Sequence, residues 1–186
     1  MKIEIYSETI CPWCYVGYAR LQQALAARPG VPVELDWLPF ELSPDLPPEG
    51  EDRREYMLRR FGDVDRFAAG QRQLIEVGAA LGIDFRFERI TRAPNTRRSQ
   101  TLIRWAREAG MAIQNEVERR VLQAHFTEGR DIADPQVLAD LAIALVLVLV
   151  WLWRDAKATG RNPVPWVVLT LATGSFGPLI YLLTRR

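Results

Sequence analysis

The sequence predicts an α/β fold with a strand–helix–strand start, a helical insertion and a C-terminal apolar helical hairpin. Three observations predict this arrangement. Residues 1–38 hold two short segments of alternating polarity around one helical segment, and the middle of the chain shows mainly helical periodicity. From residue 141 the chain becomes far more apolar. We therefore expect two domains, residues 1–140 and 141–186.

The strand–helix–strand start is justified by its polarity pattern. Alternation over Lys2–Tyr6 is typical of a short strand. From Trp13 to Ala27 apolar residues recur near helical spacing, and Pro29-Gly30 ends that run. Alternation returns over Pro32–Leu38. Two strands joined by a helix form a βαβ unit, in which the strands usually pair in parallel.

The helical insertion follows a loop over Ser43–Gly50 that contains three prolines. Phe85–Phe87 is expected to be a short extended piece. Asn95 or Thr96 is expected to cap the helix that follows, and Asp134-Pro135 is expected to open another, because both pairs suit helix starts. The predicted helices cover residues 51–61, 65–81, 97–109 and 116–126.

The C-terminal hairpin is predicted from two stretches without charged residues, Leu141–Trp153 and Pro163–Leu183. A transmembrane helix needs about 20 apolar residues, which the second stretch provides. Tryptophan and tyrosine lie near the ends of both, as at membrane interfaces. We expect residues 141–183 to associate with a membrane. The alternative is a buried core helix followed by a strand and a last helix.

The two cysteines are the only ones in the chain and form the motif Cys11-Pro12-Trp13-Cys14 at the start of the first helix. Helix amide groups and the positive end of the helix dipole lower the pKa of a thiol in that position. Cys11 is therefore the predicted nucleophile, and Cys14, about one turn later, the resolving thiol. Pro12 would stiffen the turn, and Trp13 would form an apolar platform.

A zinc site is the main chemical alternative for two cysteines with this spacing. It would need two more ligands, and the chain offers one histidine, His125, and no third cysteine. We therefore predict redox chemistry and no metal. His125 is expected to be a packed or solvated helix residue, with a catalytic role as the alternative. Glu8, near Cys11, is expected to be a surface charge, and modulation of the Cys11 pKa is its alternative role. The net charge of +1 gives no reason to expect nucleic-acid binding.

Several segments resemble the DsbA family of thiol–disulfide oxidoreductases, specifically its cytoplasmic FrnE-like branch. The resemblance implies a thioredoxin-like fold with a helical insertion, and exchange with protein or low-molecular-weight disulfides through the Cys11–Cys14 pair without a further cofactor. Homo-oligomers are compatible with it. The matching segments occur in the family's order between residue 1 and about residue 141: 5–7, 11–17, 37–42, 47–50, 92–96 and 126–132.

Related 2-hydroxychromene-2-carboxylate isomerases and kappa-class glutathione transferases share this architecture, with serine where this chain has Cys11. Their use of glutathione suggests an alternative function, a glutathione-dependent isomerase or transferase, and makes glutathione a candidate co-substrate. Asn95 matches the position that helps to hold glutathione in those relatives, which implies substrate binding. A helix cap is the alternative role for Asn95.

The family pattern breaks near residue 140. Thioredoxin-like enzymes complete their sheet with further strands, and a cis-proline before the third strand binds the substrate backbone. Val164-Pro165-Trp166 is the only surrogate, so Pro165 is the candidate for that role. Without it the sheet is expected to be incomplete, and the alternative is an inactive or truncated membrane-tethered module. Because Met1 leads directly into the first strand, we expect a cytoplasmic catalytic domain tethered to the inner membrane.

Overall fold

The computed structural model describes the backbone of residues 1–62, 64–173 and 176–184. The chain begins with β1 (Lys2–Ser7), α1 (Pro12–Ala26) and β2 (Glu34–Pro39). The two strands pair in parallel, with Lys2 opposite Glu34 and Ser7 opposite Pro39. The predicted βαβ unit is therefore confirmed, and within the described residues its sheet has these two strands.

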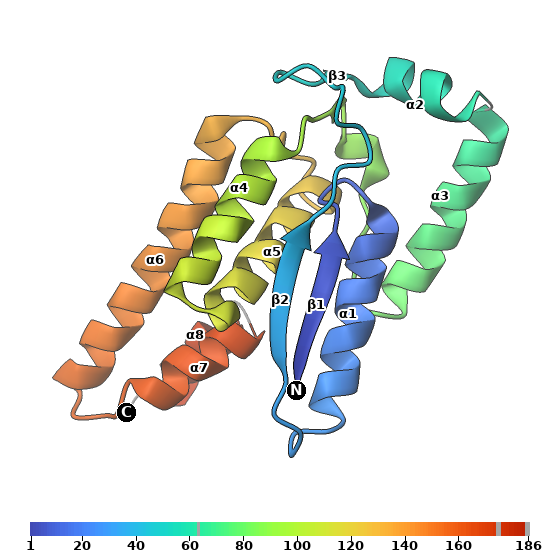
Figure 1. Ribbon diagram of the computed structural model, residues 1–186. Helices are drawn as coiled ribbons and strands as arrows, with labels where there is room; N and C mark the ends of the chain where they lie inside the picture. Colours follow the sequence, from blue (N-terminus) through green and yellow to red (C-terminus); the bar gives the residue numbers. More distant parts are fainter. Residues whose placement is uncertain (63, 174–175, 185–186) are drawn as a thin grey trace.

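Helices surround this strand pair on two sides (Figure 1). On one side α4 and α5 contact β2, and α6 packs against both; on the other side α1 contacts α3. A short antiparallel ribbon of β3 and β4 lies beyond the carboxyl ends of the long strands, beside α2. The bounds of these elements are β3 Glu51–Asp52, α2 Arg53–Phe61, α3 Val64–Ala79, β4 Arg92–Ala93, α4 Arg97–Ala106, α5 Met111–Phe126 and α6 Pro135–Ala158.

The main hydrophobic core lies between α1, α5 and the segment that links α3 to β4. Its centre is a group of aromatic rings, in which Phe85 stacks on Phe87 at 5.0 Å and meets Phe126 edge to face at 5.6 Å. Val121 and Leu122 of α5 are fully buried. This packing fixes α1, and therefore the cysteine motif at its start, against α5.

Helix starts follow the sequence closely. The Asp134 side chain accepts a hydrogen bond from the Gln136 amide at 2.8 Å, and Pro135 is the first residue of α6, as predicted. The helix predicted from residue 116 begins earlier, at Met111, because Gly110 adopts a positive φ of 123° that separates it from the preceding turn. The extended piece predicted over Phe85–Phe87 ends one residue early, because Phe87 is already the first residue of a single 3-10 turn, Phe87–Arg89.

The α5 residues gained by this earlier start complete the edge of β2. The Gln114 side-chain amide donates to the Trp37 carbonyl oxygen at 2.8 Å and accepts from the Trp37 amide at 3.1 Å. Buried backbone groups need such partners. The helix therefore supplies to β2 the hydrogen bonds that another strand would otherwise supply at this position.

The C-terminal segment differs from the predicted hairpin. α6 crosses the domain boundary predicted at residue 140 without a break. The predicted span 163–183 is divided between α7 (Val164–Thr173) and α8 (Phe176–Thr184), and α7 replaces the strand of the alternative prediction. Pro178 lies in the first turn of α8, where its missing amide is tolerated, whereas deep inside one continuous helix it would break a hydrogen bond.

The expected membrane association of residues 141–183 finds no support in these helices. In the part of the chain that the structure describes, none of them is long and apolar enough to cross a membrane. Side chains at positions 144, 145, 147, 148, 150, 171–177 and 179 lie outside the described residues.

The C-terminal helices form a small core of their own. Leu152 and Ala156 of α6 and Tyr181 of α8 are fully buried. The Tyr181 hydroxyl donates to Asp155 Oδ2 at 2.5 Å, and the Arg161 guanidinium lies 4.5 Å from the centre of the Trp166 ring. α7 and α8 lie near the amino-terminal ends of β1 and β2, at the opposite end from the start of α1 (Figure 1).

Candidate active site

The cysteine motif lies at the carboxyl end of β1. Cys11 is the N-cap of α1 in an extended conformation and Pro12 is the first helical residue, so the motif lies at the helix start that the sequence predicts. The Cys11 amide donates to the Glu8 carbonyl oxygen at 3.0 Å, and the Cys14 amide donates to the Cys11 carbonyl oxygen at 3.0 Å. Both thiols are free and half-buried. Because Cys14 follows Cys11 by one turn of helix, the two side chains lie close together.

The two thiols have opposite electrostatic environments. The Cys14 thiol, which hydrogen-bonds to Cys11, is the main cause that lowers the pKa of Cys11 to about 6; the amides of Cys14 and Trp13 add to it, and burial opposes it. The same hydrogen bond, followed by burial, raises the pKa of Cys14 far above that of an ordinary thiol. At neutral pH the pair therefore holds a thiolate on Cys11 and a proton on Cys14.

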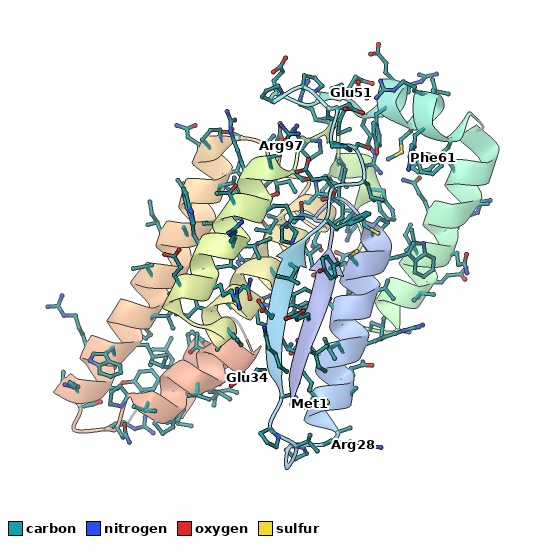
Figure 2. The ribbon with its side chains drawn as sticks, viewed as in Figure 1. Met1, Arg28, Glu34, Glu51, Phe61 and Arg97 are labelled. Carbon is teal, nitrogen blue, oxygen red and sulfur yellow. The ribbon has the colours of Figure 1, made fainter. Side chains whose placement is uncertain are left out.

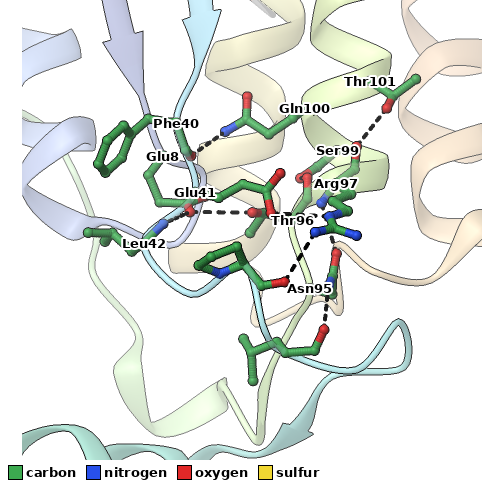
Figure 3. A network of polar contacts seen from close by, with 12 residues as sticks. Glu8, Phe40, Glu41, Leu42, Asn95, Thr96, Arg97, Ser99, Gln100 and Thr101 are labelled. Atoms are coloured by element: carbon green, nitrogen blue, oxygen red, sulfur yellow. Dashed lines mark hydrogen bonds and ion pairs between the residues drawn. The ribbon is translucent and has the colours of Figure 1, made fainter.

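Glu8 is buried beside the motif, so the prediction of a surface charge is wrong. Its carboxylate accepts hydrogen bonds from the Leu42 amide at 2.8 Å and from the Thr96 hydroxyl at 3.3 Å. Figure 3 shows these contacts joining the β1–α1 turn to the loop after β2 and to the start of α4. Burial raises the pKa of Glu8, and these hydrogen bonds oppose the shift. Glu8 thus fixes the turn that carries Cys11.

A second buried carboxylate, Glu118 of α5, lies behind Cys14. The Ser7 hydroxyl donates to Glu118 Oε1 at 2.6 Å, and Ser7 also hydrogen-bonds to the Cys14 thiol. Glu118 Oε2 has no hydrogen-bond partner among the described residues. Burial raises the pKa of Glu118 to about 7, and the nearby charge of Cys14 contributes in the same direction.

Glu118 was not among the residues predicted from the sequence. One signal was available, because Gln114, Glu118 and Leu122 follow one another at intervals of four and so share one helix face. An acid on a face that carries a core leucine is unusual. The sequence alone did not reveal which groups this face would meet.

A cavity of about 700 Å³ opens beside Cys11. Cys11, Pro12 and the half-exposed Trp13 line one wall, which agrees with the predicted apolar platform. The opposite wall comes from α2 and α3, where Phe61, labelled in Figure 2 at the end of α2, stacks on Phe67 at 5.6 Å. The helical insertion thus forms a binding space over the thiolate.

His125 lines the same cavity and is almost fully buried at 2 % exposure. Burial, reinforced by the charge of Arg53, lowers the pKa of His125 to about 3, so the imidazole is neutral. Its ring packs edge to face on Phe126 at 4.7 Å, and within the described part of the chain its Nδ1 has no hydrogen-bond partner. Of the two roles predicted for His125, packing agrees with this position.

Asn95 does not line the described cavity walls, which include its neighbours Ala93 and Pro94. Its Nδ2 donates to the Leu46 carbonyl oxygen at 2.6 Å, and its Oδ1 accepts from the Arg97 amide at 3.0 Å. These bonds tie a loop to the start of α4 (Figure 3). They correspond to the capping role that was the alternative to substrate binding.

Pro165 lies in the first turn of α7, and the described backbone contains no cis peptide bond. The start of α7 lies at the opposite end of the strand pair from the cysteines (Figure 1). The predicted cis-proline contact at Pro165 is therefore wrong. A proline fits at a helix start because the amide of that residue would have no partner there.

Among the described residues, no group of three or more histidine, cysteine, aspartate or glutamate side chains is arranged to hold a metal ion.

Comparison with known proteins identifies one family. The model of the DSBA-like thioredoxin domain matches residues 2–147. The chain is 31% identical over 146 residues to the uncharacterized protein YwbO of Bacillus subtilis (strain 168), an alignment that covers 76% of this chain and 64% of that protein.

A solved structure is also similar, that of the probable DsbA oxidoreductase SCO1869 from Streptomyces coelicolor. The TM-score is 0.65 at 31% sequence identity, with 77% of this chain and 62% of that chain covered. The chain thus spans less than two thirds of the length of either relative.

Proposed function

The chain belongs to the DSBA-like thioredoxin domain family, and from this premise we propose that it is a thiol–disulfide oxidoreductase acting through Cys11 and Cys14. One observation carries the proposal: a thiol with a pKa lowered to about 6 stands at a helix start, faces a cavity and has a protonated thiol one turn away. Such a thiol is a nucleophile at neutral pH. The substrate is a protein or low-molecular-weight disulfide.

The first step is attack by the Cys11 thiolate on one sulfur of the substrate disulfide. A bond forms between Cys11 Sγ and that sulfur, the substrate S–S bond breaks, and the other substrate sulfur leaves as a thiolate. The attacking group needs no base, because the Cys14 thiol and the helix amides already favour its charged form.

The second step requires Cys14 to lose its proton. Once Cys11 is in the mixed disulfide it carries no charge, so the main cause that raised the pKa of Cys14 is gone. Glu118, reached through Ser7, has a pKa of about 7 and accepts this proton. The Cys14 thiolate attacks Cys11 Sγ and releases the second substrate thiolate. The substrate is reduced and the cysteine pair oxidised; reversal of both steps gives the oxidase direction.

We also propose that the chain belongs to the FrnE-like branch, on the segments that resemble it. Glutathione is the low-molecular-weight thiol that we propose as a co-substrate, because the isomerases and transferases of similar architecture use it.

The test compares Cys11→Ser with Cys14→Ser in the full chain. We expect Cys11→Ser to abolish both insulin reduction and dithiol oxidation. Cys14→Ser should still perform the first attack, and it should accumulate a mixed disulfide that mass spectrometry detects under non-reducing conditions. Unchanged activity in Cys11→Ser would overturn the proposal. Inactivity of the native chain itself would favour the inactive module, for which the two-stranded sheet of the described residues is the specific argument.

A further inference from the structure

The geometry points to an anion-binding subsite in the cavity beside Cys11, centred on Arg53, that selects small disulfides and thiols carrying a carboxylate. This inference rests on the proposed function, because it names the substrate class of the same thiolate.

Arg53, the first residue of α2, is a partly buried cation without an anionic partner among the described residues. Its guanidinium lies between two rings, with Cζ 5.8 Å from the centre of Phe87 and 6.0 Å from that of Phe67. Burial lowers the pKa of Arg53 to about 10, so it stays charged at neutral pH. By contrast, the partly buried Arg119 is paired with Glu116 through two hydrogen bonds.

The cavity has an excess of positive charge. Three arginines line it, Arg53, Arg60 and Arg92, and its described lining contains no aspartate or glutamate. Arg92 is already engaged, by Asp131 at 3.6 Å and by the Glu49 carbonyl oxygen at 2.7 Å. Because an unpaired charge away from water is costly, a ligand that brings an anion to Arg53 gains more than one that binds at an exposed lysine or arginine.

His125 brings no second charge to the same wall. Its ring is almost fully buried, and its Nδ1 has no hydrogen-bond partner among the described residues. Because burial and the charge of Arg53 lower the pKa of His125 to about 3, the imidazole beside Arg53 is neutral.

The remaining walls determine the body of the ligand. Apart from Gln71 and Gln73 they are mainly apolar, with several aromatic rings, and a cavity of about 700 Å³ lies within the range of small-molecule sites. Carboxylate recognition by arginine together with aromatic walls fits a small thiol or disulfide with an apolar or aromatic body. The wall residues of this type are Trp13, Tyr56, Phe61, Phe67, Phe87 and Phe126.

The reaction with such a ligand follows the two steps given above. The Cys11 thiolate forms a bond to one sulfur of the disulfide, and the anionic thiolate on the other side leaves. Cys14 then loses its proton, attacks Cys11 Sγ and releases the second anionic thiolate. One disulfide is reduced and one cysteine pair is oxidised, so the electrons balance.

The test uses two aromatic disulfides of different charge on the reduced full chain. 5,5′-Dithiobis(2-nitrobenzoate) carries two carboxylates, and 4,4′-dithiodipyridine is neutral at the pH of the assay. We would measure the second-order rate constant of each by stopped-flow absorbance with the native chain, Arg53→Gln and Arg54→Gln. Arg54 is the control, because it neighbours Arg53 on α2, is exposed and does not line this cavity.

We expect Arg53→Gln to lower the second-order rate constant with the dianionic probe by about tenfold, because one charged hydrogen-bonding contact is lost. The neutral probe should change less than about twofold, because it makes no charged contact. Arg54→Gln should leave both rates unchanged within that margin. Equal slowing of both probes by Arg53→Gln, or no slowing of either, would overturn the subsite.

Two further measurements keep the test decisive if Arg53→Gln folds poorly, as circular dichroism would show. Arg53→Lys should retain most of the preference for the dianionic probe. In the native chain, salt should reduce the rate of the dianionic probe more than that of the neutral one; equal salt effects would contradict the subsite. A native chain that reacts with the neutral probe no faster than free cysteine would instead contradict the proposed function.

Discussion

The two ends of the parallel strand pair bury different kinds of side chain. At the carboxyl ends of β1 and β2, around the cysteines, the buried set includes Glu8, Glu118 and Gln100, which hydrogen-bond to backbone amides, hydroxyls and carbonyls. At the other end Leu152, Ala156 and Tyr181 form a mainly apolar core. Burying a carboxylate costs stability. The fold accepts that cost beside the thiols at Glu8 and Glu118, and also at Asp36 of β2, which Lys2 and Arg107 neutralise.

The largest effect is expected when the hydrogen bond between the two thiols is lost. We expect Cys14→Ala to raise the pKa of Cys11 from about 6 toward the ordinary thiol value, since its main stabilising contact is lost. The fraction of thiolate near neutral pH would fall from about 90 % to about 3 %, so alkylation would slow by up to about 30-fold. The measurement is the pH dependence of the iodoacetamide reaction rate.

Cys14→Ser is the matched control, because its hydroxyl can still donate to the thiolate. It should raise the pKa of Cys11 by less than Cys14→Ala does. An alkylation midpoint that stays near 6 in Cys14→Ala would show that the helix amides alone stabilise the thiolate.

The buried carboxylate of Glu118 should make the free energy of unfolding depend on pH. Because burial raises the pKa of Glu118 from 4.5 to about 7, the folded chain holds a proton that the unfolded chain releases. The free energy of unfolding therefore falls as the pH rises through this window, by up to about 3 kcal/mol from this group. Glu118→Gln has no carboxylate to titrate and should not show this fall. Between about pH 5 and about pH 8 its free energy of unfolding should therefore rise relative to that of the native chain by up to about 3 kcal/mol.

Urea unfolding at both pH values provides the measurement, and the difference between the two chains separates Glu118 from the titration of Cys11. Glu108→Gln serves as the control, because Glu108 is exposed. Its stability relative to the native chain should not depend on pH. A constant difference for Glu118→Gln as well would mean that Glu118 does not hold the proton.

The smallest effect is expected at the apolar end. Tyr181→Phe removes the hydroxyl that donates to Asp155 at 2.5 Å and should reduce the free energy of unfolding by about 1.5–3 kcal/mol, the range for hydrogen bonds to charged groups. The alkylation midpoint of Cys11 should stay unchanged, because Tyr181 lies at the far end of the strand pair. Thermal unfolding provides the measurement. Tyr6→Phe is the control and should leave the stability unchanged, because Tyr6 is exposed. A shifted Cys11 midpoint would show that the two ends are coupled.

Local patterns were sufficient for the strand–helix–strand start and for most helix starts. Alternation identified β1 and β2, and Asp134-Pro135 marked the start of α6, because strand faces and helix caps depend on residues close in sequence. The pattern failed at the C-terminus, where uncharged residues were interpreted as one membrane span. There Pro178 and the packing of Tyr181 against α6 divide the segment into α7 and α8.

The same limit applies to the site. Cys11 and Cys14 could be predicted from the sequence, because a thiol pair one turn apart at a helix start is a local arrangement. That the Cys14 thiol, more than the helix amides, lowers the pKa of Cys11 is seen in the folded chain. The same holds for the burial of Glu8, for the contact of Glu118 with Ser7 beside Cys14, and for Arg53, which faces the cavity without an anionic partner among the described residues. These residues come from elements far apart in the sequence, and the charge or protonation that each holds depends on which groups and how much water folding leaves around it.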